Sequence, residues 1–215
     1  SYAAEKMARD LSELRMITCH LGNGSSITAI DHGRAVDTSM GFTPLEGLAM
    51  GTRSGDIDPT VVQYLIHKTD MTLDEAIEYL NKQSGVLGIS GVSSDFRNIF
   101  SAADRGDERA KLAIDIYCYR VKKYIGAYVA AMGGADAIVF TAGIGENAPR
   151  IRKMIMDGMD YLNAWLDEEK NNAQEEIISG EKSAITIMAV HTNEELMIAR
   201  ETQALCGTSI SGGNI

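Results

Sequence analysis

Residues 17–30 constrain the fold most, because two β-type runs flank a turn that holds two glycines, Gly22 and Gly24. A glycine turn between two such runs is an ordinary hairpin signal. Glycine also lets a ligand approach the backbone, and the inward-facing amides of such a turn favour an anion. His20 and the pair Ser25-Ser26 add side-chain hydrogen-bond donors on either side of the same turn. The sequence predicts a hairpin here and leaves open whether its turn binds phosphate.

The composition bounds the class of protein. The chain has 215 residues, of which 45% are hydrophobic, so it can bury a sizeable core in one large or two small domains. Acidic residues outnumber basic ones by 30 to 20, and the net charge of −10 argues against a nucleic-acid or anionic-membrane partner. The three cysteines lack metal-binding or redox spacing, which is typical of a reducing compartment. With no signal peptide and no membrane-spanning stretch visible, we expect a cytoplasmic protein.

Tight turns and strands open the chain, and helices alternating with strands follow. The expected strands cover residues 16–21, 25–31, 34–37, 137–141 and 184–190, the first three antiparallel and the later ones parallel. The expected helices cover residues 3–14, a segment from Asp58-Pro59 through Ile66, a segment capped by Thr72 and Glu75, residues 107–131, segments up to about residue 172, and residues 193–205. This order predicts an α/β domain with a mixed sheet and helices on both faces.

Glycine-rich segments separate these elements. We expect loops over residues 40–58 and 84–94, a turn over residues 142–147, and a frayed tail over residues 208–215. The turn at Gly143-Ile144-Gly145 lies between a buried strand and a helix, where open α/β sheets bind ligands. It lacks the third glycine of the dinucleotide fingerprint, and a tight strand-to-helix crossover also needs glycine. Ligand binding and simple chain reversal therefore both stay open for this turn.

Two charged groups follow glycine-rich segments. Arg53 is a lone arginine on a loop before a helix, where its planar guanidinium is well placed to meet phosphate oxygens. A salt bridge to Asp56 or Asp58 is the structural alternative. Asp95-Phe96-Arg97 offers a carboxylate, an aromatic face and a cation together, although Asp95 also fits a helix N-cap.

Acidic residues mark the expected start of the last helix. A carboxylate at Glu194 or Glu195 could hold a divalent metal, directly or through water. Acidic residues in the first turn of a helix are also routine. Simple charge pairing at the helix start is the favoured interpretation for Glu195, and the role of Glu194 depends on the other motifs.

Taken together, these segments resemble the C-terminal half of the acetate kinase family, and propionate kinases share most of them. The matching segments are residues 17–26, 37–47, 51–56, 93–97, 140–147 and 192–195, which together span nearly the whole chain. The resemblance implies a ribonuclease-H-like fold of the actin, Hsp70 and sugar kinase superfamily. It also implies that residues 1–207 form a C-terminal domain that binds nucleotide and dimerises.

The resemblance assigns roles to individual residues, with ATP or ADP and Mg²⁺ as cofactors and a short-chain carboxylate as phosphoryl acceptor. The implied phosphate-binding residues are His20, Leu21, Gly22, Asn23 and Gly24. The implied adenosine and ribose residues are Asp95, Phe96, Arg97, Gly143, Ile144, Gly145, Glu146 and Asn147. Arg53 would stabilise the transferring phosphoryl group, and Glu194 would support Mg²⁺. Amides, an arginine and a metal suit phosphoryl transfer, which depends on positioning and charge neutralisation.

Members of the family have a second, N-terminal domain, and this sequence matches only the C-terminal one. The family's catalytic histidine and carboxylate-binding residues are therefore missing from this chain. We expect an inactive half of an acetate kinase that forms a homodimer. The alternatives are half of a propionate kinase or a non-catalytic module that binds nucleotide or a partner. A purely structural interaction domain would leave the two glycine turns and the glycine-rich loop that carries Arg53 unexplained.

Overall fold

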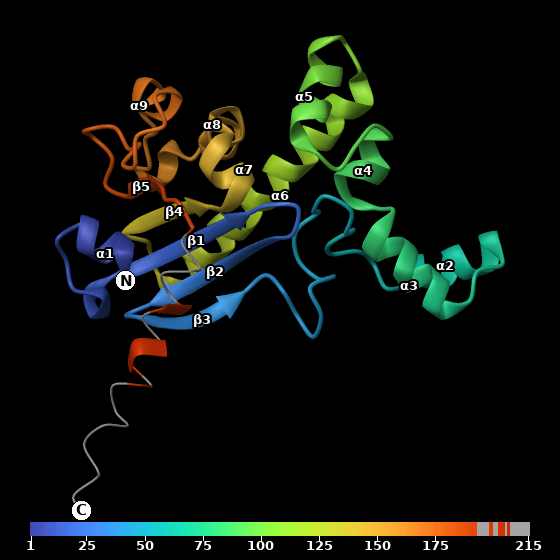
Figure 1. The fold of residues 1–215 in the computed structure, drawn as a ribbon, viewed down its shortest axis with the longest axis horizontal. Coiled ribbons are helices and arrows are strands. Elements are labelled where there is room, and N and C mark those ends of the chain that lie inside the picture. Colours follow the sequence, from blue (N-terminus) through green and yellow to red (C-terminus); the bar gives the residue numbers. More distant parts are fainter. Residues whose placement is uncertain (193–197, 200–201, 205, 207–215) are drawn as a thin grey trace, which may run out of the picture.

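A five-stranded mixed sheet forms the centre of the computed structural model, which describes residues 1–192, 198–199, 202–204 and 206 (Figure 1). The strands are β1 (Arg15–Leu21), β2 (Ser25–Asp31), β3 (Arg34–Thr38), β4 (Ala137–Thr141) and β5 (Thr186–Ala189). They lie in the order β3-β2-β1-β4-β5. As expected, β1, β2 and β3 pair antiparallel, whereas β4 pairs parallel with β1 and β5 parallel with β4.

Helices surround the sheet and extend from one end of it (Figure 1). They are α1 (Tyr2–Lys6), α2 (Thr60–Thr69), α3 (Leu73–Lys82), α4 (Gly85–Ser90), α5 (Phe96–Asp104), α6 (Glu108–Met132), α7 (Ala142–Asn147), α8 (Pro149–Met156) and α9 (Glu168–Asn172), with 3-10 turns at Leu11–Glu13 and Asp160–Leu162. The capping box expected at Thr72 and Glu75 is confirmed. Helix α6 starts at the N-cap Asp107 and ends at Gly133, whose φ of +68° suits glycine.

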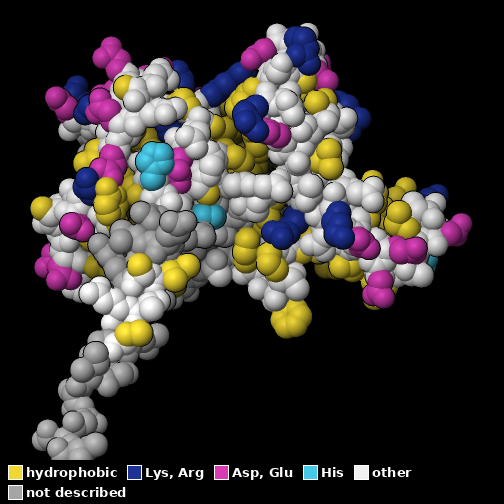
Figure 2. Space-filling view, in the orientation of Figure 1, with side chains coloured by type: hydrophobic (Ala, Val, Ile, Leu, Met, Phe, Trp, Pro, Cys, Tyr) yellow, Lys and Arg dark blue, Asp and Glu magenta, His cyan; other side chains and the backbone are white. Residues whose placement is uncertain are grey.

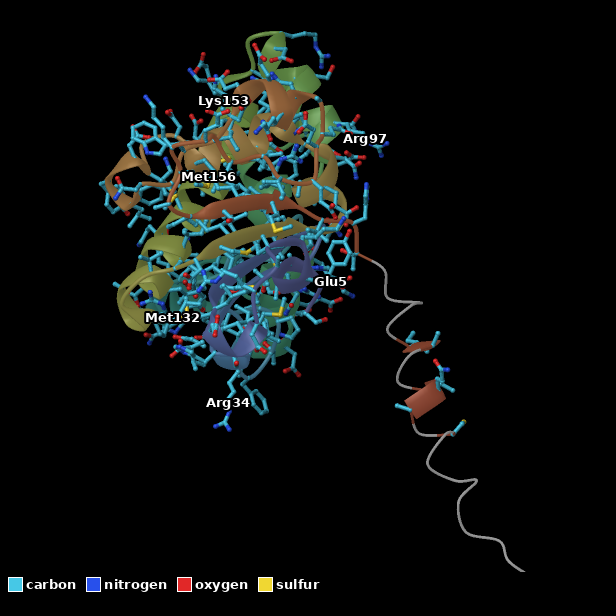
Figure 3. The ribbon with its side chains drawn as sticks, turned by 90° about the vertical axis from the view of Figure 1, so that its left-hand side faces the viewer. Glu5, Arg34, Arg97, Met132, Lys153 and Met156 are labelled. Carbon is cyan, nitrogen blue, oxygen red and sulfur yellow. The ribbon has the colours of Figure 1, made fainter. Side chains whose placement is uncertain are left out.

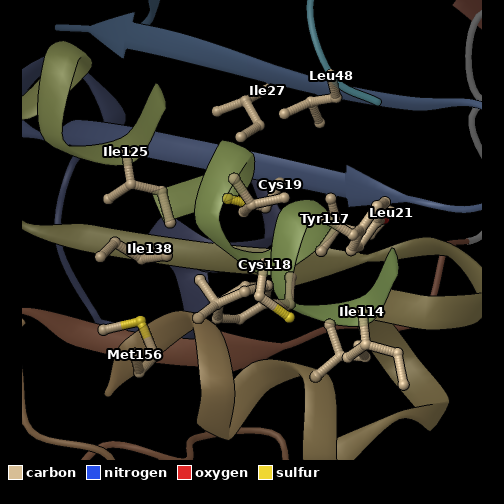
Figure 4. Close-up of a cluster of buried hydrophobic side chains, with 14 of the residues drawn as sticks. Cys19, Leu21, Ile27, Leu48, Ile114, Tyr117, Cys118, Ile125, Ile138 and Met156 are labelled. Atoms are coloured by element: carbon tan, nitrogen blue, oxygen red, sulfur yellow. The ribbon is translucent and has the colours of Figure 1, made fainter. Parts of the chain in front are cut away.

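The main hydrophobic core lies between the sheet and α6. Cys19 of β1 and Ile27 of β2 lie in one buried cluster with Tyr117 and Ile125 of α6 (Figure 4). The other face of the sheet is covered by a smaller cluster in which Ala3, Ala4 and Leu14 join apolar residues of β1, β4 and β5. Helices on both faces are therefore confirmed, and the short apolar strand β4 is buried on both sides, as a central strand should be.

Three expectations about local structure are wrong. The helix expected over residues 3–14 ends at Lys6, because Ala8 has a φ of 52° and Asp10 caps a separate 3-10 turn through Ser12. The expected loop over residues 84–94 contains helix α4, and the expected turn over residues 142–147 is helix α7. Glycine allows close packing at Gly85 of α4 and at Gly145 of α7, where a Cβ would lie 3.3 Å from the Phe140 carbonyl carbon. A Cβ at Gly85 would lie 2.2 Å from the Met50 carbonyl oxygen.

Few other expected boundaries of strands and helices differ from those in the structure. The last strand is shorter than residues 184–190 and covers Thr186–Ala189. Within the expected final helix over residues 193–205, residues 198–199 and 202–204 are helical. Glu194 and Glu195, like the tail over residues 208–215, lie outside the described residues. Among the described helices, none combines the length and hydropathy needed to cross a bilayer.

Candidate functional site

A cavity of about 950 Å³ lies where the first glycine turn faces helices α5 and α7. Figure 2 shows the hollow between these elements, with hydrophobic side chains at its base. Its lining residues are Gly22, Asn23, Ser94, Asp95, Phe96, Arg97, Phe100, Gly143, Ile144, Asn147, Ala148, Pro149 and Arg150. Three segments that are distant in the sequence therefore meet at one site, at the carboxyl ends of β1 and β4.

The first glycine turn is held from beneath by the core. Gly22 N–H donates to the Gly24 carbonyl at 3.0 Å, which closes the turn between β1 and β2. The buried Ser25 hydroxyl donates to the Gly22 carbonyl at 2.9 Å and lies 3.0 Å from the Tyr117 hydroxyl of α6. His20 Nδ1 lies 3.1 Å from Thr141 Oγ1, which links the ends of β1 and β4. These contacts fix the backbone of the turn, in which Gly22 and Asn23 line the cavity.

The loop that carries Arg53 packs against this turn. Gly51 N–H donates to the Asn23 carbonyl at 2.9 Å, and a Cβ at Gly51 would lie only 1.8 Å from Asn23 Oδ1. A larger residue at position 51 would displace the Asn23 side chain and crowd the Asn23 carbonyl, so glycine favours this close approach. Arg53 is half-buried, and its Nη1 lies 3.7 Å from the sulfur of Met50 and 3.3 Å from where a Cβ on Gly24 would stand.

Arg53 forms no ion pair with any described carboxylate, so the alternative salt bridges to Asp56 and Asp58 are absent. Asp56 instead accepts from Gly47 N–H and from the Tyr124 hydroxyl. Asp58 accepts from the amide and hydroxyl of Thr60. The result is a half-buried cation beside the glycine turn with its charge uncompensated by the described residues.

Helix α5 supplies the opposite wall of the cavity. Asp95 caps the helix by accepting from Arg97 N–H at 2.9 Å, and it also pairs with the Arg97 guanidinium at 2.6 Å. This pairing lowers the pKa of Asp95, because the charged form accepts these hydrogen bonds. The Arg97 side chain is 90% exposed and points outward at the cavity rim (Figure 3). Phe96 is buried, and its ring lies 4.7 Å from that of Tyr117.

Comparison with known proteins agrees with this arrangement. The sequence matches the Acetokinase family over residues 1–200. The chain belongs to this family. Acetate kinase of Heliobacterium modesticaldum is 58% identical over 205 residues, which cover 95% of this chain and 52% of that protein. Acetate kinase of Thermoanaerobacterium thermosaccharolyticum is 57% identical over 206 residues, again covering 52% of the relative. The chain thus spans about half the length of the curated relatives it matches.

Solved structures of the family share the fold. The crystal structure of Porphyromonas gingivalis acetate kinase matches with a TM-score of 0.93 and 47% sequence identity. The match covers 95% of this chain and 52% of the Porphyromonas gingivalis chain. The crystal structure of a propionate kinase from Francisella tularensis matches with a TM-score of 0.87 and 46% sequence identity. The match covers 93% of this chain and 51% of the propionate kinase chain. The expected fold class, an α/β domain like those of these kinases, is confirmed.

The acetokinase motifs do not all line the cavity. Gly22, Asn23, Asp95, Phe96, Arg97, Gly143, Ile144 and Asn147 do. His20, Leu21, Gly24, Gly145 and Glu146 are not among the lining residues, and Arg53 lies on the loop beside Gly24. Glu194 lies outside the described residues. The described part of the chain holds no group of three or more His, Cys, Asp or Glu residues suited to a metal ion.

Five lining residues are absent from the site predicted from the sequence, namely Ser94, Phe100, Ala148, Pro149 and Arg150. The Phe100 ring lies 4.7 Å from the Arg150 guanidinium, which also pairs with Asp104 at 2.8 Å. Phe100 follows Phe96 by one helical turn, a spacing that places both rings on one face of α5. Arg150 follows Pro149 at the start of α8, directly after the second glycine turn. The four-residue spacing of Phe100 from Phe96 and the position of Arg150 after the second glycine turn are the sequence signals that could have identified these two residues.

Glu146 joins α7 to the chain that leaves β5. Its carboxylate accepts from Thr192 N–H at 2.7 Å, from the Thr192 hydroxyl at 2.9 Å, and from His191 Nδ1 at 2.8 Å. Its side chain is only 13% exposed. Partial burial alone would raise the pKa of Glu146, but the hydrogen bonds from Thr192 and His191 outweigh it and hold the pKa below its ordinary value.

We expect Glu146 to make the chain sensitive to acid. Because its pKa is lower in the folded state, its stabilising contribution is present above the ordinary value of 4.5 and is lost as pH falls through the folded pKa. Glu146→Gln should therefore lower the melting temperature at pH 7 and have a much smaller effect at the acid end. Glu168→Gln, at an exposed surface pair, is the control. Equal effects of Glu146→Gln at both pH values would contradict this account.

Proposed function

We propose that this chain is the nucleotide-binding half of an ATP:acetate phosphotransferase, which moves the γ-phosphoryl group of ATP reversibly onto acetate. The observation that carries the proposal is the half-buried Arg53 guanidinium, which lies beside Gly24 with no ion pair to a described carboxylate. A partly buried cation without a charged partner is less favourable than one that an anion neutralises. The glycine turn beside it leads into the 950 Å³ cavity, whose size suits a nucleotide.

The proposed binding mode follows the cavity. Adenosine lies between α5 and α7, against Phe96 and Ile144, and the phosphates extend toward Gly22 and Asn23. Arg53 then meets the oxygens of the transferring phosphoryl group, where charge redistributes during transfer. A planar guanidinium can contact two of these oxygens at once.

The remaining components come from outside the described residues. We propose that Glu194 supports Mg²⁺, which would neutralise charge on the phosphates. The chain covers 52% of the acetate kinase from Heliobacterium modesticaldum, so the carboxylate site and the catalytic histidine are proposed to lie in an N-terminal half. We also propose a cytoplasmic homodimer. Half of a propionate kinase is the second candidate, because the Francisella tularensis propionate kinase is 46% identical to this chain.

Calorimetric titration of this chain with ADP and ATP tests the proposal. We expect weak binding and negligible formation of acetyl phosphate, because one wall of the catalytic site is missing. Gly143→Leu should abolish binding without unfolding the chain, since a Cβ at Gly143 meets no atom within 4 Å and the longer side chain would fill the cavity. Ala127→Leu, at an exposed position of α6, is the matched control.

Two results would count against the proposal. One is the absence of any ADP binding at millimolar concentration, which would remove the nucleotide site. The other is robust acetyl phosphate formation by this chain alone, which would show that the residues assigned to an N-terminal half are not needed.

A further inference from the structure

The loop that presents Arg53 is closed at its base by Asp56. Asp56 N–H donates to the Gly47 carbonyl at 2.9 Å, and Gly47 N–H donates back to Asp56 Oδ1 at 2.8 Å. Closer to the tip, Met50 N–H donates to the Arg53 carbonyl at 3.0 Å. Gly47 has a φ of +102°, and a Cβ there would lie 2.1 Å from the Ser39 carbonyl oxygen, so this geometry requires glycine. The loop is therefore a fixed structure with Arg53 near its tip.

Helix α6 engages the other oxygen of the same carboxylate. The Tyr124 hydroxyl donates to Asp56 Oδ2 at 2.8 Å. Arg120 donates to the Asp56 carbonyl, and its Nη1 lies 3.9 Å from Oδ2. Burial, together with the neighbouring Asp56 carboxylate, raises the pKa of Tyr124, so its hydroxyl stays a proton donor at neutral pH. Both carboxylate oxygens of Asp56 are thus occupied by groups other than Arg53.

This occupancy matters because Asp56 is the carboxylate nearest to Arg53 in the sequence within their shared loop. A loop arginine three residues from an aspartate ordinarily pairs with it, since a charge-assisted hydrogen bond is stronger than a neutral one. A paired Arg53 would have to break that contact before it could meet a phosphate. The hydrogen bonds from Gly47 and Tyr124 and the charge of Arg120 each weaken the attraction of Asp56 for Arg53.

We propose that Tyr124 and Arg120 of α6 are positioning residues, which hold the Asp56 carboxylate and so keep Arg53 free for the phosphoryl group. This inference rests on the proposed function of Arg53. When the Asp56 carboxylate is released from Tyr124 and Arg120, it pairs with Arg53 and lowers the rate of phosphoryl transfer. Loss of its partners on α6 should therefore be corrected by removing its charge.

The test compares Y124F/R120Q with Y124F/R120Q/D56N in the complete kinase that carries this half. We expect the double variant to lower kcat by about tenfold or more, with a much smaller change in the KM for ATP, because Asp56 captures Arg53. Adding D56N should restore part of kcat, since asparagine has no charge to hold the guanidinium. Y128F is the matched control, because the Tyr128 hydroxyl faces Asp37 of β3 instead of this loop.

Nitrogen NMR of the Arg53 guanidinium in this chain gives a second measurement that does not depend on activity. We expect slowed rotation of the guanidinium in Y124F/R120Q and normal rotation once D56N is added. A purely structural role predicts instead that D56N adds to the loss of kcat, or leaves it unchanged, and that result would overturn the inference. R53A is measured beside them. If R53A lowers kcat and the double variant does not, the inference alone is wrong; if R53A retains kcat, the proposed function of Arg53 is wrong.

Discussion

Replacing Arg53 by alanine in the complete kinase that carries this half should lower kcat by about 10²–10³ and change the KM for ATP much less. The argument is differential binding. A guanidinium that meets the phosphoryl oxygens as charge redistributes stabilises the transition state more than the ground state, so its loss appears mainly in kcat. The half-buried position of Arg53 beside Gly24 strengthens the effect, because nearby water is reduced and the local dielectric is low.

Lysine at the same position should restore only part of the lost rate. It keeps the positive charge but loses the planar fork that contacts two oxygens together. Arg53→Lys therefore separates the contribution of charge from that of geometry, on the same preparation and in the same assay.

A structural role for Arg53 makes a different prediction. If the guanidinium served mainly to stabilise the loop, Arg53→Ala would melt several degrees lower and keep a near-normal kcat per folded molecule. The described residues show no ion pair for it to lose, and its polar neighbour is the sulfur of Met50. Melting temperature and steady-state kinetics on one preparation decide between the two roles, and a low melting temperature with normal kcat would contradict the catalytic one.

Local chemistry in the sequence was enough to predict the sheet and the segments that meet at the cavity. The β1–β2 hairpin, the apolar strand β4 and the long helix α6 each carry a clear periodicity or capping signal. The composition of the glycine turns suits an anion, so ligand binding is one of the two interpretations that the sequence leaves open for them. Residues Gly22, Asn23, Gly143, Ile144 and Asn147 do line the cavity.

Other features depend on contacts between distant segments and could not be predicted. Helices α4 and α7 are rich in glycine, which locally signals a turn, yet Gly85 of α4 packs closely on the Arg53 loop and Gly145 of α7 packs closely on β4. The Asp56–Tyr124 hydrogen bond joins residues separated by 68 positions. Nothing in the spacing of either residue indicates that the carboxylate turns toward α6 and away from Arg53.

Arg152 is the clearest case of a residue whose importance appears only in the structure. Its side chain is fully buried. Its Nη1 donates to the carbonyls of Gly145 and Glu146 at 2.8 and 2.7 Å, and Nε and Nη2 donate to the side chain and carbonyl of Asn171. Burial lowers the pKa of Arg152 to about 10, so the group stays cationic at neutral pH. The guanidinium thereby joins the end of α7 to α8 and α9.

Arg152→Met should destabilise the chain by about 3 kcal/mol or more. Methionine has a similar length and removes the cost of burying a charge, which favours the variant. Against this, three buried acceptors on Gly145 and Asn171 and one partly buried acceptor on Glu146 lose their donor, at about 1–3 kcal/mol each. The lost donors outweigh the relieved desolvation, because the acceptors are enclosed and no other described side chain replaces the guanidinium.

The neighbouring residue provides the control for this experiment. Lys153 is exposed and pairs with Glu168 on the surface (Figure 3), so Lys153→Met should change the unfolding free energy by less than about 1 kcal/mol. Urea denaturation of both variants measures the difference. Folded Arg152→Met should also bind ADP more weakly than the parent chain, since Gly143, Ile144 and Asn147 lie on the helix that the guanidinium holds. A variant as stable as Lys153→Met would show that the four acceptors find other donors, and that Arg152 does not fix α7.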